Sequence, residues 1–128
     1  MITFQPMNST NAFRIAAVLG FLGVALGAFG AHSLKDVLEK NNAVDIWKTA
    51  STYHLIHAVV MLFIASRSPL PFVPWVLFLA GIVIFSGSLY GYAVTHIRLL
   101  AMITPVGGLC FLAGWLWLAI KPFTAEAS

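Results

Sequence analysis

The chain has 128 residues, of which 60% are hydrophobic and 9% are charged, and its formal net charge is +3. A water-soluble domain carries about 25% charged residues, so this deficit indicates a protein that folds in lipid. The Lys and Arg residues are scattered rather than clustered among aromatics, which argues against nucleic acid as a partner. The length allows one bundle of membrane helices and no separate soluble domain.

The first predicted span covers residues 13–31 and follows a polar arm in which residues 9–11 offer side chains for a helix cap. Glycines recur in this span at intervals of three and four residues and therefore share one helical face: Gly20, Gly23, Gly27 and Gly30. Such a stripe indicates a close contact between helices, since glycine otherwise lowers helix stability. A secretory signal peptide is the alternative, because Arg14 precedes an apolar stretch and small residues. The stripe and the three later spans favour a retained helix.

Residues 32–46 form the most polar part of the chain, with Leu34 and Leu38 at helical spacing. This pattern predicts a short amphipathic helix at the membrane interface. Asp36 and Lys40 stand four residues apart, a spacing at which they can form an ion pair. A solvated charged face explains the acidic residues here better than a catalytic pair of carboxylates does.

The second predicted span, residues 47–65, is polar at its start and apolar at its end. Tyr53, His54 and His57 lie in the polar half, and their spacings of three and four residues favour one helical face. A proline-rich connection at residues 66–71 then ends the helix.

The third predicted span, residues 75–95, begins at Trp75, which is expected to act as an interface anchor. Deep in this apolar run lies the stretch Phe85-Ser86-Gly87-Ser88-Leu89-Tyr90-Gly91-Tyr92. Hydroxyls, phenols and glycines would be badly placed against lipid. They predict neighbouring helices that pack closely and accept their hydrogen bonds.

The fourth predicted span, residues 99–120, contains Thr104 and Pro105 one to two turns from its start. Either the helix begins there with Thr104 as its cap, or Pro105 kinks it near Gly107 and Gly108. Cys110 lies in an apolar segment without a second cysteine, so it is predicted to be a core residue with no disulfide.

Four spans with short connections predict an all-α membrane protein, an up-down-up-down bundle with a short interfacial helix between the first two spans. Threading the chain gathers the polar and small residues in the half next to the first and third connections. The candidate polar residues are His32, Tyr53, His54, His57, Ser86, Ser88, Tyr90 and Thr104, and the small residues include Gly87, Gly91, Gly107 and Gly108.

Two interpretations of this polar half remain open: hydrogen bonds between helices, or a vestibule that admits water or a small polar ligand. A metal or haem site on His54 and His57 is the weaker alternative, because zinc ordinarily takes three or four ligands and no Cys, Asp or Glu lies at matching depth. No metal and no cofactor is therefore predicted.

Several motifs together carry a family resemblance. They are Gly27-Ala28-Phe29-Gly30-Ala31-His32, Tyr53-His54-Leu55-Ile56-His57-Ala58, Phe85-Ser86-Gly87-Ser88-Leu89-Tyr90, Ile103-Thr104-Pro105-Val106-Gly107-Gly108 and Gly114-Trp115. In this order and at these separations they closely resemble the family called domain of unknown function 423, which is similar to animal transmembrane protein 256. The resemblance covers nearly the whole chain after Asn11. It implies a small integral protein of the bacterial inner membrane with about four spans, and it implies no activity.

The expected function is that of a non-catalytic structural or accessory protein that packs with itself or with a larger membrane complex. The alternative is a carrier or channel-like protein for a small polar solute or a proton, using His54, His57, Ser86 and Tyr90. An enzyme ranks third, because no carboxylate inside the membrane orients a histidine.

Orientation follows from the distribution of basic residues. The first and third connections are flanked by Lys35, Lys40, Lys48 and Arg98, and the opposite side carries Arg14, Arg67 and Lys121. This balance places the first and third connections in the cytoplasm.

Overall fold

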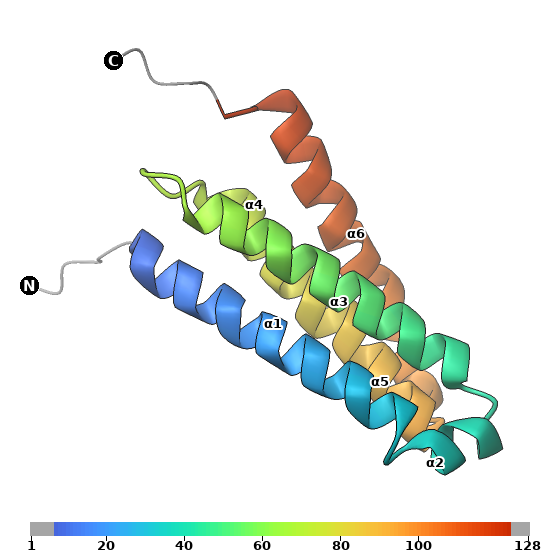
Figure 1. Ribbon diagram of the computed structural model, residues 1–128. Coiled ribbons are helices and arrows are strands. Elements are labelled where there is room, and N and C mark those ends of the chain that lie inside the picture. Colours follow the sequence, from blue (N-terminus) through green and yellow to red (C-terminus); the bar gives the residue numbers. More distant parts are fainter. Residues whose placement is uncertain (1–6, 124–128) are drawn as a thin grey trace, which may run out of the picture.

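The computed structural model describes residues 7–123, and the secondary structure of this part of the chain is helical, with short turns and loops between the helices (Figure 1). Its helices are α1 (Ser9–Ala31), α2 (Lys35–Lys40), α3 (Val44–Ala65), α4 (Phe72–Gly81), the π-helical turn η1 (Ile82–Ser86), α5 (Gly87–Thr95) and α6 (Arg98–Ile120). The elements α4, η1 and α5 follow one another without a break and form one segment of 24 residues, Phe72–Thr95.

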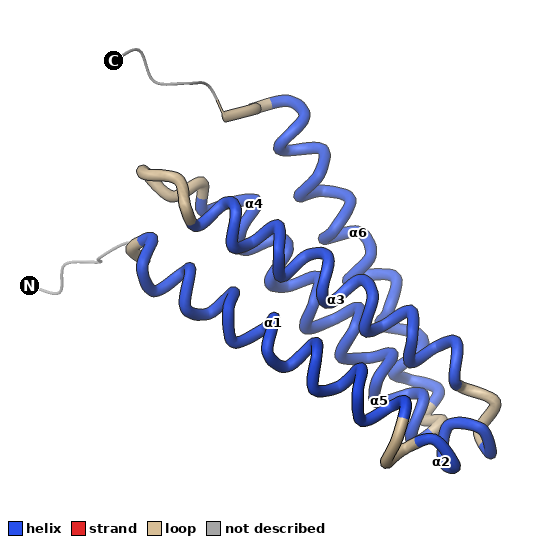
Figure 2. The backbone as a smooth tube through the Cα atoms, in the orientation of Figure 1, coloured by secondary structure: helices blue, strands red, loops and turns tan. Residues whose placement is uncertain are grey.

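The four long segments run in alternating directions, and each lies beside the segment that precedes it (Figures 1 and 2). Thus α3 packs between α1 and the segment Phe72–Thr95, and α6 packs against the other side of that segment. We call the end that holds α2 and the turn between α5 and α6 the loop end. The opposite end, with residues 66–71 and both ends of the described chain, is the terminal end.

Three of the long segments are apolar enough and long enough to cross a membrane: α1, Phe72–Thr95 and α6. The fourth, α3, has 22 residues but does not meet this standard, since its first half carries the polar residues noted in the sequence. The predictions of an all-helical chain and of a short helix after the first long one are confirmed.

Helix α2 packs on the bundle through one residue and exposes its charges. Leu38 is buried against Ala43, Trp47 and Ala93, so a single leucine holds this short helix to α3 and α5. No ion pair closer than 4.0 Å occurs within residues 7–123, so the pairing of an Asp and a Lys expected on this helix does not form. The charged face is solvated instead.

The structure corrects one prediction about a helix start and decides between two alternatives at another. Asn8 caps α1, with its Oδ1 accepting the backbone N–H of Asn11 at 2.8 Å, so the cap lies one residue before the predicted set Ser9 to Asn11. Helix α6 begins at Arg98 and contains Pro105, which excludes the alternative in which the helix starts with Thr104 as its cap. The Thr104 hydroxyl donates instead to the carbonyl oxygen of Leu100 one turn earlier, as Ser and Thr within helices often do.

The terminal half of the bundle is an apolar core in which Trp75 is fully buried. Ala12 and Ala16 of α1 and Met61 of α3 belong to the same cluster. The prediction that Trp75 is an interface anchor is therefore wrong. Small residues on α1 leave room for the indole ring, which fills the space between helices.

Helices α4 and α6 interlock through two reciprocal pairs of phenylalanine and glycine. A Cβ on Gly114 would lie 2.6 Å from the Phe78 ring, and a Cβ on Gly81 would overlap the Phe111 ring. Each ring thus occupies the place of a missing side chain on the other helix. Such close approach is the usual basis of helix association in lipid, where no hydrophobic force distinguishes a neighbouring helix from acyl chains.

Candidate functional site

His54 joins three helices through both of its ring nitrogens. Its Nε2 lies 2.8 Å from the carbonyl oxygen of Leu19 on α1, and its Nδ1 lies 2.9 Å from the hydroxyl of Tyr90 on α5. A carbonyl oxygen only accepts, so Nε2 carries the hydrogen and Nδ1 accepts the Tyr90 hydroxyl proton. The side chain is 3% exposed. His54 is therefore held by two protein partners, one at each ring nitrogen.

The Tyr90 hydroxyl extends this chain toward the loop end. It lies 3.5 Å from Oγ of Ser51 on α3, and its ring packs against the Trp47 indole with centroids 4.7 Å apart. The Trp47 indole N–H donates to the carbonyl oxygen of Leu26 at 2.8 Å. Polar contacts therefore run from His54 through Tyr90 to Ser51. Trp47 lies beside them and is hydrogen-bonded to α1.

His57 is also satisfied on both sides, but with the opposite arrangement of hydrogens. Its Nδ1 lies 2.7 Å from the carbonyl oxygen of Tyr53 one turn earlier and must be the donor. Its Nε2 accepts the indole N–H of Trp115 at 3.0 Å. The imidazole stacks on Phe111 with centroids 3.7 Å apart. His57 therefore lies inside an aromatic cluster between α3 and α6.

The hydroxyls of the third span bind neighbouring helices. Ser86 is fully buried and donates to the carbonyl oxygen of Ala50 on α3 at 2.8 Å. Ser88 and Thr104 share a hydrogen bond that joins α5 to α6, and Thr104 also lies 3.0 Å from the carbonyl oxygen of Leu100. These groups form two polar links between helices, from Ser86 to α3 and from Ser88 to α6.

The remaining two candidates differ in their surroundings: Tyr53 lies at the exposed edge of the aromatic cluster around His57, and His32 lies apart from it. Tyr53 is 44% exposed, and its ring stacks near His57 with centroids 6.1 Å apart. His32 is exposed at the end of α1. The structure thus brings His54 together with Tyr90, His57 with Tyr53, and Ser88 with Thr104, and it does not gather all the candidates around one space.

Four residues of the network were missing from the candidate set: Trp47, Ser51, Phe111 and Trp115. Nothing in the sequence sets these two tryptophans apart from the others, and Ser51 is one of several polar residues at a helix start. The one available signal was the spacing of Ser51 and His54 by three residues on the same helix.

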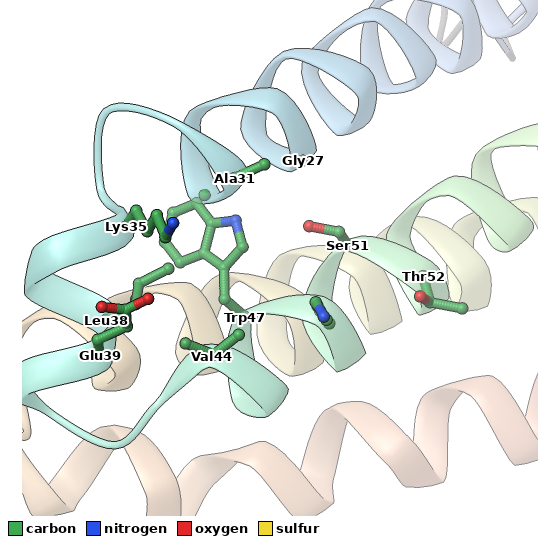
Figure 3. Close-up of a pocket in the computed structure, with 11 residues that line it drawn as sticks. Gly27, Ala31, Lys35, Leu38, Glu39, Val44, Trp47, Ser51 and Thr52 are labelled. Atoms are coloured by element: carbon green, nitrogen blue, oxygen red, sulfur yellow. The ribbon is translucent and has the colours of Figure 1, made fainter.

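A cavity of about 450 Å³ opens at the loop end, between α1, α2 and α3 (Figure 3). Its lining consists of Gly27, Gly30, Ala31, Lys35, Leu38, Glu39, Val44, Trp47, Lys48, Ser51 and Thr52. Figure 3 shows the Trp47 indole in the middle of these side chains, with Ser51 farther along α3. Neither His54 nor His57 lines the cavity. Ser51 does line it, and Ser51 is connected to His54 through the Tyr90 hydroxyl.

Only some of the predicted glycines mark close helix contacts. A Cβ would overlap Trp47 at Gly30 and the backbone of Phe85 at Gly107, and it would lie 2.7 Å from Leu55 at Gly23. A Cβ at Gly91 would lie 2.9 Å from Leu100. The other four, Gly20, Gly27, Gly87 and Gly108, have room for a Cβ.

The two connections at the loop end are joined to each other. Nδ2 of Asn41 donates to the carbonyl oxygens of Ala93 and Val94, each at 3.0 Å. In return, Nε2 of His96 donates to the carbonyl oxygen of Asn41 at 2.8 Å. His96 adopts the left-handed conformation with φ 57°. These bonds satisfy carbonyls that the end of α5 leaves open.

Metal binding finds no support in the described residues, among which no group of three His, Cys, Asp or Glu side chains comes together. The ring nitrogens of His54 and His57 are occupied by protein partners. Cys110 is a free, half-buried thiol.

Known proteins resemble this chain over most of its length. The family model described as "Protein of unknown function (DUF423)" matches residues 26–108. The UPF0382 inner membrane protein YgdD of Escherichia coli strain K12 is 44% identical over 116 residues, covering 85% of this chain and 86% of that protein. A UPF0382 membrane protein of Staphylococcus haemolyticus is 41% identical over 114 residues, covering 85% and 92% of the two chains.

The UPF0382 membrane protein YwdK of Bacillus subtilis strain 168 is 38% identical over 113 residues, covering 83% of this chain and 90% of that protein. No solved structure matches the chain. The family resemblance found in the sequence motifs is confirmed. The chain therefore belongs to the DUF423 (UPF0382) family, and it is an integral, multi-pass protein of the bacterial inner membrane.

Proposed function

We propose that this chain is a non-catalytic structural component of the inner membrane, built of four spans, that packs with itself or with a larger membrane complex. The fourth span is α3, with 22 residues. At 1.5 Å per residue this helix is about 33 Å long, enough for a hydrocarbon core of about 30 Å. The imidazoles of His54 and His57 reach a carbonyl, a hydroxyl and an indole on neighbouring helices, so α3 can cross lipid without leaving these two rings unpaired.

The observation that carries the non-catalytic role is the state of the two membrane histidines. A general base, a nucleophile or a metal ligand needs a ring nitrogen that faces a substrate or an ion. All four nitrogens of His54 and His57 face protein atoms instead. The carboxylates within residues 7–123 are Asp36, Glu39 and Asp45, all at the loop end and none beside either histidine.

The outer helices supply the surface for a partner. Helix α1 packs mainly against α3, and it exposes Phe21 and Val24. Helix α6 packs against the segment Phe72–Thr95, and it exposes Leu109 and Leu112. Both faces are apolar, as a partner helix within the membrane requires.

Site-specific photocrosslinking in native membranes tests this role. A photoreactive residue at Phe21 or at Leu112 is expected to give a protein adduct of defined mass. Val83, an exposed residue on the segment between α3 and α6, is the matched control at similar exposure. If positions along α1 and α6 react with lipid alone, the structural role in an assembly is excluded.

The second candidate is transfer of a small polar solute or a proton, favoured by the chain of contacts from the cavity through Ser51 and Tyr90 to His54. This chain ends at the carbonyl oxygen of Leu19, and the terminal half beyond it is apolar. Proton flux into proteoliposomes that contain the wild-type protein, lost in Tyr90→Phe, would support transfer. Equal flux in protein-free vesicles would remove this candidate.

A further inference from the structure

The cavity at the loop end combines charges of both signs with an apolar wall. Lys35 and Glu39 reach it from α2 and Lys48 from α3, while Leu38, Val44 and the Trp47 indole supply apolar surface (Figure 3). The three charged side chains form no ion pair closer than 4.0 Å within residues 7–123. Two ammonium groups and one carboxylate around one space are thus free to meet a ligand.

We propose that this cavity binds the phosphoethanolamine headgroup of a bilayer phospholipid. A phosphodiester is an anion that Lys35 and Lys48 can pair with, and the primary ammonium of ethanolamine is a donor for the Glu39 carboxylate. Charge-assisted hydrogen bonds of this kind are shorter and stronger than those between neutral groups. A headgroup without a cation would leave Glu39 facing an anion.

The position of the cavity matches the depth of a lipid headgroup. Ser51 lies seven residues after the start of α3 at Val44, which is about 10 Å along the helix axis. Tryptophan is typical of the boundary between headgroups and acyl chains, and Trp47 lies within the same turns. This site therefore lies where headgroups of the surrounding bilayer are concentrated.

An apolar track on α3 continues from the cavity and favours a lipid over a soluble phosphate. Thr52 lines the cavity, and Ile56, Val59 and Phe63 follow it at spacings of three and four residues. These three side chains are 50%, 62% and 55% exposed. From Thr52 to Phe63 the helix rises about 16 Å, a length over which an acyl chain can lie against it.

The cavity is preformed rather than induced. A Cβ at Gly30 would overlap the Trp47 ring, and the hydrogen bond from Trp47 to Leu26 holds that ring in place. Gly27 faces the cavity, and an added Cβ there would meet only the Ser51 hydroxyl, at 4.0 Å. The volume of the cavity therefore depends on the fixed Trp47 indole and on the lack of a side chain at Gly27. A larger residue at position 27 should fill the cavity.

Native mass spectrometry of the purified full chain tests the site. The protein is mixed with equimolar phosphatidylethanolamine, phosphatidylcholine and phosphatidylglycerol that share the same acyl chains. We expect phosphatidylethanolamine to be retained about tenfold over each of the others, equivalent to about 1.4 kcal/mol. The choline ammonium carries no N–H for Glu39, and the glycerol headgroup carries no cation. Equal retention of the three lipids would overturn the proposal.

Variants separate the two halves of the headgroup. Glu39→Gln is expected to abolish the preference over phosphatidylglycerol, whereas the double variant Lys35→Gln and Lys48→Gln lowers the retention of both lipids. Lys40→Gln is the matched control, since Lys40 lies on the same helix but does not line the cavity. Gly27→Leu should displace all bound lipid. Unchanged retention in Glu39→Gln or in Gly27→Leu contradicts the assignment.

A soluble competitor distinguishes the lipid from its headgroup alone. O-phosphoethanolamine at the concentration of the lipid should displace nothing, because it cannot use the track on α3. Displacement at equal concentration would assign the cavity to a soluble ligand and overturn the lipid proposal. This site goes beyond the structural role proposed above, and its failure leaves the crosslinking test of that role unaffected.

Discussion

Trp115 donates its indole N–H to Nε2 of His57 across 3.0 Å, although the backbones of α3 and α6 do not lie side by side in the described chain. The bond passes beside Phe111, whose ring stacks on the imidazole with centroids 3.7 Å apart. Two helices that are not direct neighbours are thereby linked through side chains. The link also determines which nitrogen of His57 carries a hydrogen.

Removing this donor should destabilise the bundle without unfolding it. Trp115→Phe keeps an aromatic ring in contact with Phe78 but leaves Nε2 of His57 without a partner. Hydrogen bonds between membrane helices average about 0.6 kcal/mol and reach about 1.7 kcal/mol. We expect a loss within this range in the free energy of unfolding, measured by denaturant titration in mixed micelles. A loss well above it would mean that ring packing, not the bond, dominates.

The two histidines are expected to be neutral and to differ in tautomer. His54 carries its hydrogen on Nε2, because that nitrogen faces the Leu19 carbonyl, and His57 carries it on Nδ1, because that nitrogen faces the Tyr53 carbonyl. Nitrogen-15 NMR of selectively labelled histidine should therefore place the hydrogen of His54 on Nε2 and that of His57 on Nδ1. Exposed His32 serves as an internal reference. Identical tautomers for His54 and His57 would contradict the hydrogen-bond assignment.

Alanine at two glycine positions should separate close helix contacts from open ones. A Cβ at Gly107 would overlap the backbone of Phe85, which cannot rotate away, whereas Gly20 has nothing within 4 Å of an added Cβ. Overpacking of this kind costs about 1–3 kcal/mol. Gly107→Ala is expected to lose that much stability, measured by thermal denaturation in detergent. Gly20→Ala should be as stable as the wild type, and equal losses at both positions would contradict the packing described.

Asn41→Ala should loosen the loop end locally. The substitution removes donors to the Ala93 and Val94 carbonyls, and a single hydrogen bond contributes about 1 kcal/mol. Hydrogen exchange by mass spectrometry is expected to show faster exchange at the end of α5 and in the turn that follows it. Exchange in α4 should stay unchanged. Lys40→Ala, one residue earlier and exposed, is the control and should leave the α5 end protected.

Cysteine labelling will establish the orientation. Cysteines at Lys40 and Ser68 lie at opposite ends of the bundle, and both positions are exposed. Basic residues favour the loop end in the cytoplasm. In right-side-out vesicles an impermeant maleimide should label position 68 and spare position 40. The reverse pattern would invert the orientation, and labelling at both positions would argue against α3 as a span.

Much of the helical framework could be read from the sequence, because long apolar runs and breaking prolines determine where membrane helices begin and end. The π-helical turn at Ile82–Ser86 could not. It coincides with contacts made far along the chain: Ser86 donates to Ala50, and the backbone of Phe85 fits against Gly107. The residues next to this turn in the sequence do not indicate these contacts, because the partners lie far away along the chain.

The site was predictable only as a list of polar residues. Spacing on one helix placed His54 and His57 close together, but their partners come from α1, α5 and α6. The cavity was less accessible still, because it forms where α2 folds back beside Gly27 and Trp47. The sequence predicts an interfacial helix but not the direction in which that helix folds back, because the direction depends on the burial of Leu38.

The order in which the segments lie side by side bears on biogenesis. Chains enter the bilayer from the N-terminal end as they are synthesised. Here α3 meets α1, Phe72–Thr95 meets α3, and α6 meets Phe72–Thr95. Every long segment after α1 thus finds a binding surface already inserted when it is made. Assembly can therefore keep pace with translation, and α1 gains its partner as soon as α3 follows it into the bilayer.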